Sequence, residues 1–187
     1  MNNEPVIREA KPSDESGLVE LFRCLYQESD FLLIEPCEFN LTLEKQAELI
    51  EEIIGLDSKV LLVAESNEVL VGFLGGTGGN VNRNRHSINI AMGVLNESQS
   101  KGIGLELLSS FEIWASQKQF HRLELTVMEG NIKASSLYKR AGFEVEGLKR
   151  NALRVDGAYV NEIYMAKFIS EETGISSPRE PYESSAS

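Results

Sequence analysis

The stretch SQSKGIG, residues 98–104, has the composition of a site that could bind an anion. It places Gly102 and Gly104 one residue apart, beside Lys101 and ahead of an apolar run. Glycines at such a junction can serve simply as a tight turn before a helix. They can also let backbone N–H groups approach an anion, which the dipole of the following helix stabilises. The glycine pair alone leaves both interpretations open.

The surroundings of the pair favour the anion site. A strand pattern ends near Val94 and a helical pattern begins at about Gly102, so several N–H groups would converge beside Lys101. The segment lacks the GxxxxGK signature of a P-loop and the third glycine of a dinucleotide-binding motif. The context therefore indicates a cradle for a pyrophosphate group of another kind.

A second candidate is Tyr138, which lies on the apolar side of a predicted helix. Ala134, Leu137, Tyr138 and Ala141 follow the i, i+3, i+4, i+7 spacing of one helical face. This spacing alone favours a core tyrosine whose hydroxyl finds a hydrogen-bond partner. Chemistry at Tyr138 needs further support.

The elements that must position these residues alternate between strand and helix patterns. Strands are predicted at residues 5–10, 60–65, 69–75, 87–95, 123–128, 143–148 and 160–168. Helices are predicted from the capping residues 11–14 to about 27, and at 42–54, 102–117 and 131–140, with Gly55 ending the second. The order β-α-α-β-β-β-α-β-α-β-β predicts an α/β fold around a largely antiparallel sheet. The glycine-rich stretch 75–85 is predicted to be a mobile connection.

Length and composition limit the class of protein. The 187 residues suit one domain, residues 1–169, followed by a disordered polar tail, residues 170–187. The net charge of −11 argues against nucleic acid as a partner. The absence of a signal sequence or a long apolar run predicts a cytoplasmic protein that does not enter membranes. Cys24 and Cys37 fit neither a disulfide framework nor a metal motif.

Two motifs together resemble those of the GNAT N-acetyltransferase family. The acyl-CoA-binding motif of that family, Gln or Arg, two residues, Gly, one residue, Gly or Ala, is met within VLNESQSKGIG. The downstream stretch VMEGNIKASSLYKRAGFEVEG is similar to a second family segment, and RVDGAYVNEIYMAKF to the last hairpin of the amino-acid and ribosomal-protein alanine acetyltransferase subgroups. The resemblance covers about residues 6–168 and is topological before residue 60. The residues that match the two motifs are Gln99, Gly102, Gly104, Asn131, Ala134, Leu137, Tyr138, Gly142 and Phe143.

The resemblance implies a GNAT fold with acetyl-CoA as co-substrate. The mostly antiparallel sheet would be splayed between strands 87–95 and 123–128, with the pantetheine arm in the gap. An N–H on the first of these strands would stabilise the oxyanion. Asn131 would hydrogen-bond the arm, and Tyr138 would protonate the departing CoA thiolate. The residues implied in acetyl-CoA binding are Met92, Gly93, Val94, Gln99, Ser100, Lys101, Gly102, Ile103, Gly104, Leu105, Asn131 and Tyr138.

The general base is left open by the sequence. An amine must lose a proton before it attacks, and one GNAT subgroup carries a glutamate where this chain has Thr126. We assign the role to Glu124, which shares a strand face with Thr126, while Glu129, His86 and a water chain stay as alternatives. No metal is predicted, since neither His86 nor His121 stands at metal-ligand spacing.

The resemblance implies direct attack by a primary amine in a ternary complex. The acceptor would be a small amine, an amino acid or a protein N-terminus, held by residues 31–42 and 151–159. These segments carry Glu35, Glu38, Arg154 and Asp156. A homodimer is also expected from the family. Two alternatives remain, a non-catalytic acyl-CoA-binding sensor or scaffold, and an interaction module without a cofactor.

Overall fold

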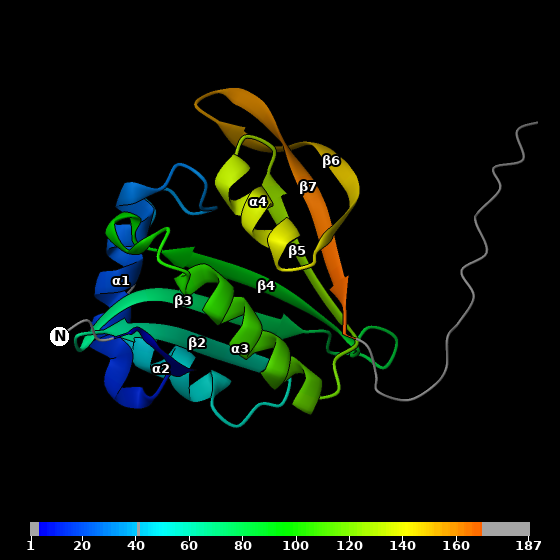
Figure 1. Ribbon diagram of the computed structural model, residues 1–187. Helices are drawn as coiled ribbons and strands as arrows, with labels where there is room; N and C mark the ends of the chain where they lie inside the picture. Colours follow the sequence, from blue (N-terminus) through cyan, green and yellow to red (C-terminus); the bar gives the residue numbers. More distant parts are fainter. Residues whose placement is uncertain (1–3, 41, 170–187) are drawn as a thin grey trace, which may run out of the picture.

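The computed structural model describes residues 4–40 and 42–169, which form a seven-stranded sheet with helices on both faces (Figure 1). The strand order is β1-β2-β3-β4-β5-β7-β6. The strands are β1 (Val6–Glu9), β2 (Lys59–Ser66), β3 (Val69–Gly78), β4 (Ser87–Val94), β5 (Arg122–Met128), β6 (Glu144–Val155) and β7 (Ala158–Phe168). The predicted tail, residues 170–187, lies outside the described residues.

The four α-helices follow the predicted order of elements. They are α1 (Glu15–Glu28), α2 (Leu43–Ile53), α3 (Ile103–Gln117) and α4 (Ile132–Arg140), with short 3-10 helices at Pro12–Asp14 and Asn96–Ser98. Thr42 caps α2, because its side chain accepts a hydrogen bond from the Lys45 N–H. Gly55 follows α2 with a φ of +87°, which agrees with its predicted role at the end of that helix.

Alternation along β2 and β3 gives the sheet two separate cores. Val63 of β2 and Phe73 of β3 pack with α1 and α2. The most deeply buried helix residues there are Leu18, Leu21 and Ile50. On the opposite face, α3 and α4 pack against the alternate strand residues, around the fully buried Phe111. Successive strand residues point to opposite faces, so each strand contributes to both layers.

The contact between β4 and β5 is short and parallel, unlike the antiparallel pairs elsewhere in the described sheet. It comprises the pairs Ser87 with Arg122, Ile88 with Leu123, and Asn89 with Glu124. Beyond Asn89 the two strands diverge, as Figure 1 shows, while β4 stays paired with β3 through Val94. The predicted fold class, a mostly antiparallel mixed sheet splayed between two central strands, is confirmed.

Two boundaries differ from the prediction for a physical reason. Residues 75–78, predicted as part of a connection, belong to β3 instead. A Cβ on Gly76 would lie 2.6 Å from a ring carbon of Phe111, so the glycine serves packing there rather than a turn. Only glycine allows that close approach, so here it belongs to a strand. The strand predicted at 143–148 runs on to Val155, past a break in register between Lys149 and Leu153.

Candidate active site

The glycine motif forms the N-terminal end of α3. Gly102 is the N-cap residue with a φ of +90°, a conformation that other residue types rarely adopt. The N–H of Leu105 turns back to the Gly102 carbonyl at 2.9 Å. The N–H groups of Ile103 and Gly104 come earlier in the first turn, where a helix offers them no acceptor of its own. They are therefore the donors that this end of α3 presents to an anion.

Gln99 holds the loop that leads into α3. Its Nε2 donates to the Val94 carbonyl at 3.0 Å and to Asn96 Oδ1 at 2.9 Å. The side chain thus ties the loop to the end of β4. Ser100, with a φ of +61°, and the exposed Lys101 follow it before Gly102.

Gly104 serves close packing as well as the turn. A Cβ at this position would lie 2.9 Å from Leu137 Cδ2 and 3.5 Å from Met92 Cε. The glycine therefore lets α3 approach both α4 and β4. The structure brings the two sequence motifs together at this point.

Met92, Gly93 and Val94 form the diverging end of β4. They pair with Leu74, Phe73 and Gly72 of β3, and the β4–β5 register ends three residues earlier, at Asn89. This stretch of β4 therefore has a strand on one side and the opening toward β5 on the other. An extended ligand can add to such a strand edge through main-chain hydrogen bonds.

Tyr138 lies on the α3–α4 face of the sheet, inside the core. Its ring meets Phe143 edge to face, with the centroids 5.8 Å apart. Only 7% of the residue is exposed, and burial raises the pKa of Tyr138 to about 12. The hydroxyl therefore keeps its proton at neutral pH. It is available as a hydrogen-bond donor or as an acid.

Asn131 is the N-cap of α4. Its Oδ1 accepts a hydrogen bond from the Ala134 N–H at 3.1 Å, which orients the first turn of the helix. This capping hydrogen bond uses the oxygen of the side-chain amide. The proposed hydrogen bond to a pantetheine arm would use the Nδ2 group.

The predicted base candidates lie at different levels of β4 and β5. Glu124 lies at the closed end of the gap, where its carboxylate accepts from Arg122 Nε at 2.8 Å. Glu129 follows β5 and accepts from Asn161 Nδ2 at 2.8 Å. The His86 carbonyl accepts from the N–H groups of His121 and Arg122, so His86 precedes even the closed end. It lies six residues before Met92, about 20 Å along an extended strand.

A carboxylate that the sequence analysis did not select lies beside Thr126. The Thr126 hydroxyl donates to Glu162 Oε1 at 2.9 Å, and Lys149 Nζ donates to Glu162 Oε2 at 3.1 Å. The side chain of Glu162 is 12% exposed, so these partners hold a largely buried anion. Its signal in the sequence was faint, because Glu162 is one of 29 acidic residues and both partners come from other strands.

Of the two segments expected to hold an acceptor, the first consists of turns and bends over residues 31–40, and the second is the tip of the β6–β7 hairpin. In the first, the Glu35 N–H donates to Glu38 Oε2 at 3.0 Å, so Glu38 stabilises its own loop. Phe31 at its start reaches to 3.8 Å from the Cβ position of Gly130, at the end of β5. In the second, Asp156 and Gly157 form the turn between β6 and β7, both with positive φ.

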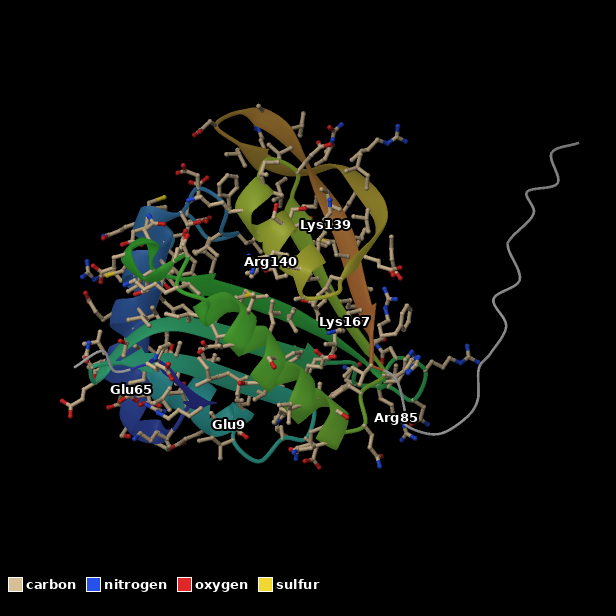
Figure 2. The ribbon with its side chains drawn as sticks, viewed as in Figure 1. Glu9, Glu65, Arg85, Lys139, Arg140 and Lys167 are labelled. Carbon is tan, nitrogen blue, oxygen red and sulfur yellow. The ribbon has the colours of Figure 1, made fainter. Side chains whose placement is uncertain are left out.

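A cavity of about 230 Å³ lies between α3, β5 and the end of α4. Figure 2 shows Lys139 and Arg140 in the last turn of α4 and Lys167 on β7. Lys167 Nζ binds Glu112 of α3 at 2.6 Å and the Ala141 carbonyl at 2.9 Å, so it joins three elements beside the cavity. The residues that line the cavity are Leu105, Leu108, Ser109, Glu112, Leu123, Ala141 and Phe143.

No helix among residues 4–40 and 42–169 is long and apolar enough to cross a membrane. The same residues contain no group of three or more His, Cys, Asp or Glu side chains that could hold a metal ion. The absence of a metal cofactor stays a prediction.

Comparison with known structures supports the fold assignment. An acetyltransferase of the GNAT family from Streptococcus pneumoniae superposes with a TM-score of 0.85 at 27% identity, over 89% of this chain and 100% of that one. The ribosomal-protein-alanine N-acetyltransferase from Brucella melitensis superposes with a TM-score of 0.77 at 24% identity, over 88% of this chain and 99% of that one.

Sequence comparison gives the family. The L-amino acid N-acetyltransferase AaaT of Escherichia coli (strain K12) is 34% identical over 87 residues, which are 46% of this chain. The match spans 53%, about half, of the length of that relative. The acetyltransferase (GNAT) family profile matches residues 22–143, which include the glycine motif, β5 and α4. The chain therefore belongs to the acetyltransferase (GNAT) family.

Proposed function

We propose that this protein is an N-acetyltransferase that moves the acetyl group of acetyl-CoA to the amine of an amino acid, free or at a protein N-terminus. The observation that carries the proposal is the gap between β4 and β5. It opens after Asn89 and Glu124. Helix α3 follows β4 in the chain, and α4, which carries Tyr138, follows β5. The curated relative, by its name, acts on L-amino acids, and one structural relative on ribosomal-protein alanine.

The residues around the gap fit an extended thioester with a charged end. The N–H groups of Ile103 and Gly104, with Lys101 nearby, are suited to a pyrophosphate. The free edge of Met92, Gly93 and Val94 is suited to a pantetheine amide arm. Acetyl-CoA would supply the acetyl group there as an activated thioester.

Each residue then has a defined task in the transfer. An N–H of the β4 edge donates to the thioester oxygen, where negative charge develops as the amine attacks. Tyr138 donates its proton to the leaving sulfur, since its hydroxyl is protonated at neutral pH. The amine attacks directly in a ternary complex, so no residue of the protein becomes acylated.

The test is CoA thiol release from acetyl-CoA with a panel of amines: amino acids, peptides with free N-termini, polyamines and aminoglycosides. Release that depends on amino acids or peptides is the expected result. Release that depends only on polyamines or aminoglycosides would correct the acceptor class. Stabilisation of the protein by acetyl-CoA with no acceptor-dependent release would favour the non-catalytic acyl-CoA-binding alternative.

A further inference from the structure

The carboxylate of Glu162 is held by two strands that neighbour its own. One oxygen accepts from Thr126 of β5 at 2.9 Å and the other from Lys149 of β6 at 3.1 Å. Together these bonds fix both oxygens of a side chain that is 12% exposed. A charged group this well buried must be compensated, and here it has one cation and one hydroxyl.

The β5–β7 register places Glu162 opposite Met128, and its carboxylate reaches back to Thr126. The β4–β5 register ends with Asn89 opposite Glu124, so Thr126 lies one strand repeat further, about 7 Å beyond the last pair. If the β4–β5 register continued past its last pair, Thr126 would lie opposite Ala91, the residue before Met92. The carboxylate is therefore at the level of the β4 edge rather than at the closed end.

Glu162 and Tyr138 lie on opposite faces of the sheet. Leu125 and Val127 of β5 belong to the core that contains Tyr138, so the intervening Thr126 points to the other face. That face is open here, since Thr126 is exposed and Tyr164 is 46% exposed. An amine arriving from this face would reach a thioester in the gap from the side opposite the tyrosine.

The other candidate carboxylates are less well placed. Glu124 is bound to Arg122, at the last paired position of the closed end. Glu129 follows the end of β5, and the alternation of the strand directs it to the face opposite Thr126. Its carboxylate accepts a hydrogen bond from Asn161. Of these three carboxylates, only that of Glu162 lies both beyond the last β4–β5 pair and on the open face of the sheet.

We propose that Glu162, positioned by Thr126 and Lys149, binds the acceptor's ammonium group and takes its proton. This rests on the proposed N-acetyltransferase function. One N–H proton passes to the carboxylate and then to solvent, and the freed lone pair forms the C–N bond. The C–S bond breaks with its electron pair on sulfur, which takes a proton from Tyr138. The second nitrogen proton restores the tyrosine, so one proton is released per acetyl transferred.

The groups around Glu162 hold its carboxylate in place. Among the residues of β5, β6 and β7 packed around it, the titratable groups that face Glu162 are Lys149 and Tyr164, while β5 contributes neutral Thr126 and Met128. The ammonium of Lys149 donates to one carboxylate oxygen, so removing it takes away one of the two hydrogen bonds that position the proposed base.

The experiment measures kcat/KM for the best amine from pH 6 to 10 in wild type and three variants. Glu162→Gln keeps an acceptor for Thr126 and is expected to lose about 100-fold. Its remaining rate should rise with pH up to the pKa of the free amine, since only neutral amine reacts. Lys149→Met, which removes one of the two groups that position the carboxylate, should lower kcat/KM by about tenfold. The control Glu144→Gln, on an exposed glutamate of β6, should stay within about twofold of wild type.

The outcomes separate the two proposals. A wild type with no amine-dependent release would overturn the proposed function and this inference with it. An active wild type with an unchanged rate and profile in Glu162→Gln would overturn only the role of Glu162. A slow Glu162→Gln variant that has the wild-type pH profile and has lost acetyl-CoA binding would indicate a structural role, which also overturns it. If Glu162→Gln does not fold, a wild-type kcat/KM in Lys149→Met would overturn the role of Glu162 instead.

Discussion

The Cδ2 atom of Leu137 lies 2.9 Å from the point where a Cβ would stand on Gly104. Helices α3 and α4 therefore meet across a glycine, at the same place where β4 brings Met92. The family motif thus combines three physical demands in a short segment. Gly102 adopts a positive φ, Gly104 leaves room for Leu137, and the N–H groups of the first turn stay available to a ligand.

Gly104→Ala is expected to destabilise the protein by about 1–3 kcal/mol, because the added methyl group must push Leu137 aside. The variant should also raise the KM for acetyl-CoA, since the α3 terminus moves with the helix. Urea unfolding and steady-state kinetics measure the two effects. The control is Gly147→Ala, where a Cβ would meet nothing within 4 Å. Equal stability of the two variants would contradict the packing role of Gly104.

Gln99→Leu is expected to raise the KM for acetyl-CoA more than it lowers kcat. The leucine cannot donate to the Val94 carbonyl, so the loop that carries Ser100 and Lys101 loses its tie to β4. A net hydrogen bond of this kind contributes about 1 kcal/mol, which corresponds to about a fivefold change in KM. Isothermal titration gives the dissociation constant of acetyl-CoA without turnover, and this constant should rise by the same factor. An unchanged affinity would show that the tie has no part in binding.

Tyr138→Phe is expected to lower kcat by about 100-fold and to leave the affinity for acetyl-CoA nearly unchanged. The change removes one hydroxyl and keeps the ring that packs on Phe143. Single-turnover CoA release and acetyl-CoA titration measure the two quantities separately. Turnover equal to wild type would remove Tyr138 from the catalytic residues.

The same tyrosine gives a prediction for stability at alkaline pH. Burial raises the pKa of Tyr138 to about 12, whereas an unfolded tyrosine titrates near 10. The unfolded chain therefore loses this proton first, and the stabilising contribution, complete below about pH 10, is lost as the pH rises toward 12. Free energies of unfolding from urea titrations at pH 8 to 11 should fall more steeply in wild type than in Tyr138→Phe. Parallel curves for the two proteins would contradict the assignment.

The parts of this structure that could be predicted from the sequence are those with local signals. The apolar periodicity of α3 and the glycine after α2 each act within a few residues of themselves. The order of strands and helices followed from them. The two family motifs then indicated the neighbours of the gap, because each motif has a fixed position on its element.

The rest depended on contacts between distant residues. The segment 75–78, with three glycines among its four residues, resembles a loop until Phe111 of α3 is seen against Gly76. The extension of β6 is hidden by a break in its register, with Asn151 at a φ of +51°. Glu162 acquires its environment only when Thr126 and Lys149 arrive from two other strands. Sequence patterns do not encode which of many glutamates will receive such partners.

The short ladder between β4 and β5 also bears on how this fold holds together. Three residue pairs join a four-stranded leaf, β1 to β4, to a three-stranded leaf, β5 to β7, within the described sheet. A thioester lying along the open edge would serve as a removable strand that bridges the leaves. Substrate occupancy and cohesion of the sheet would then be thermodynamically linked, so each catalytic cycle would complete the sheet and release it again.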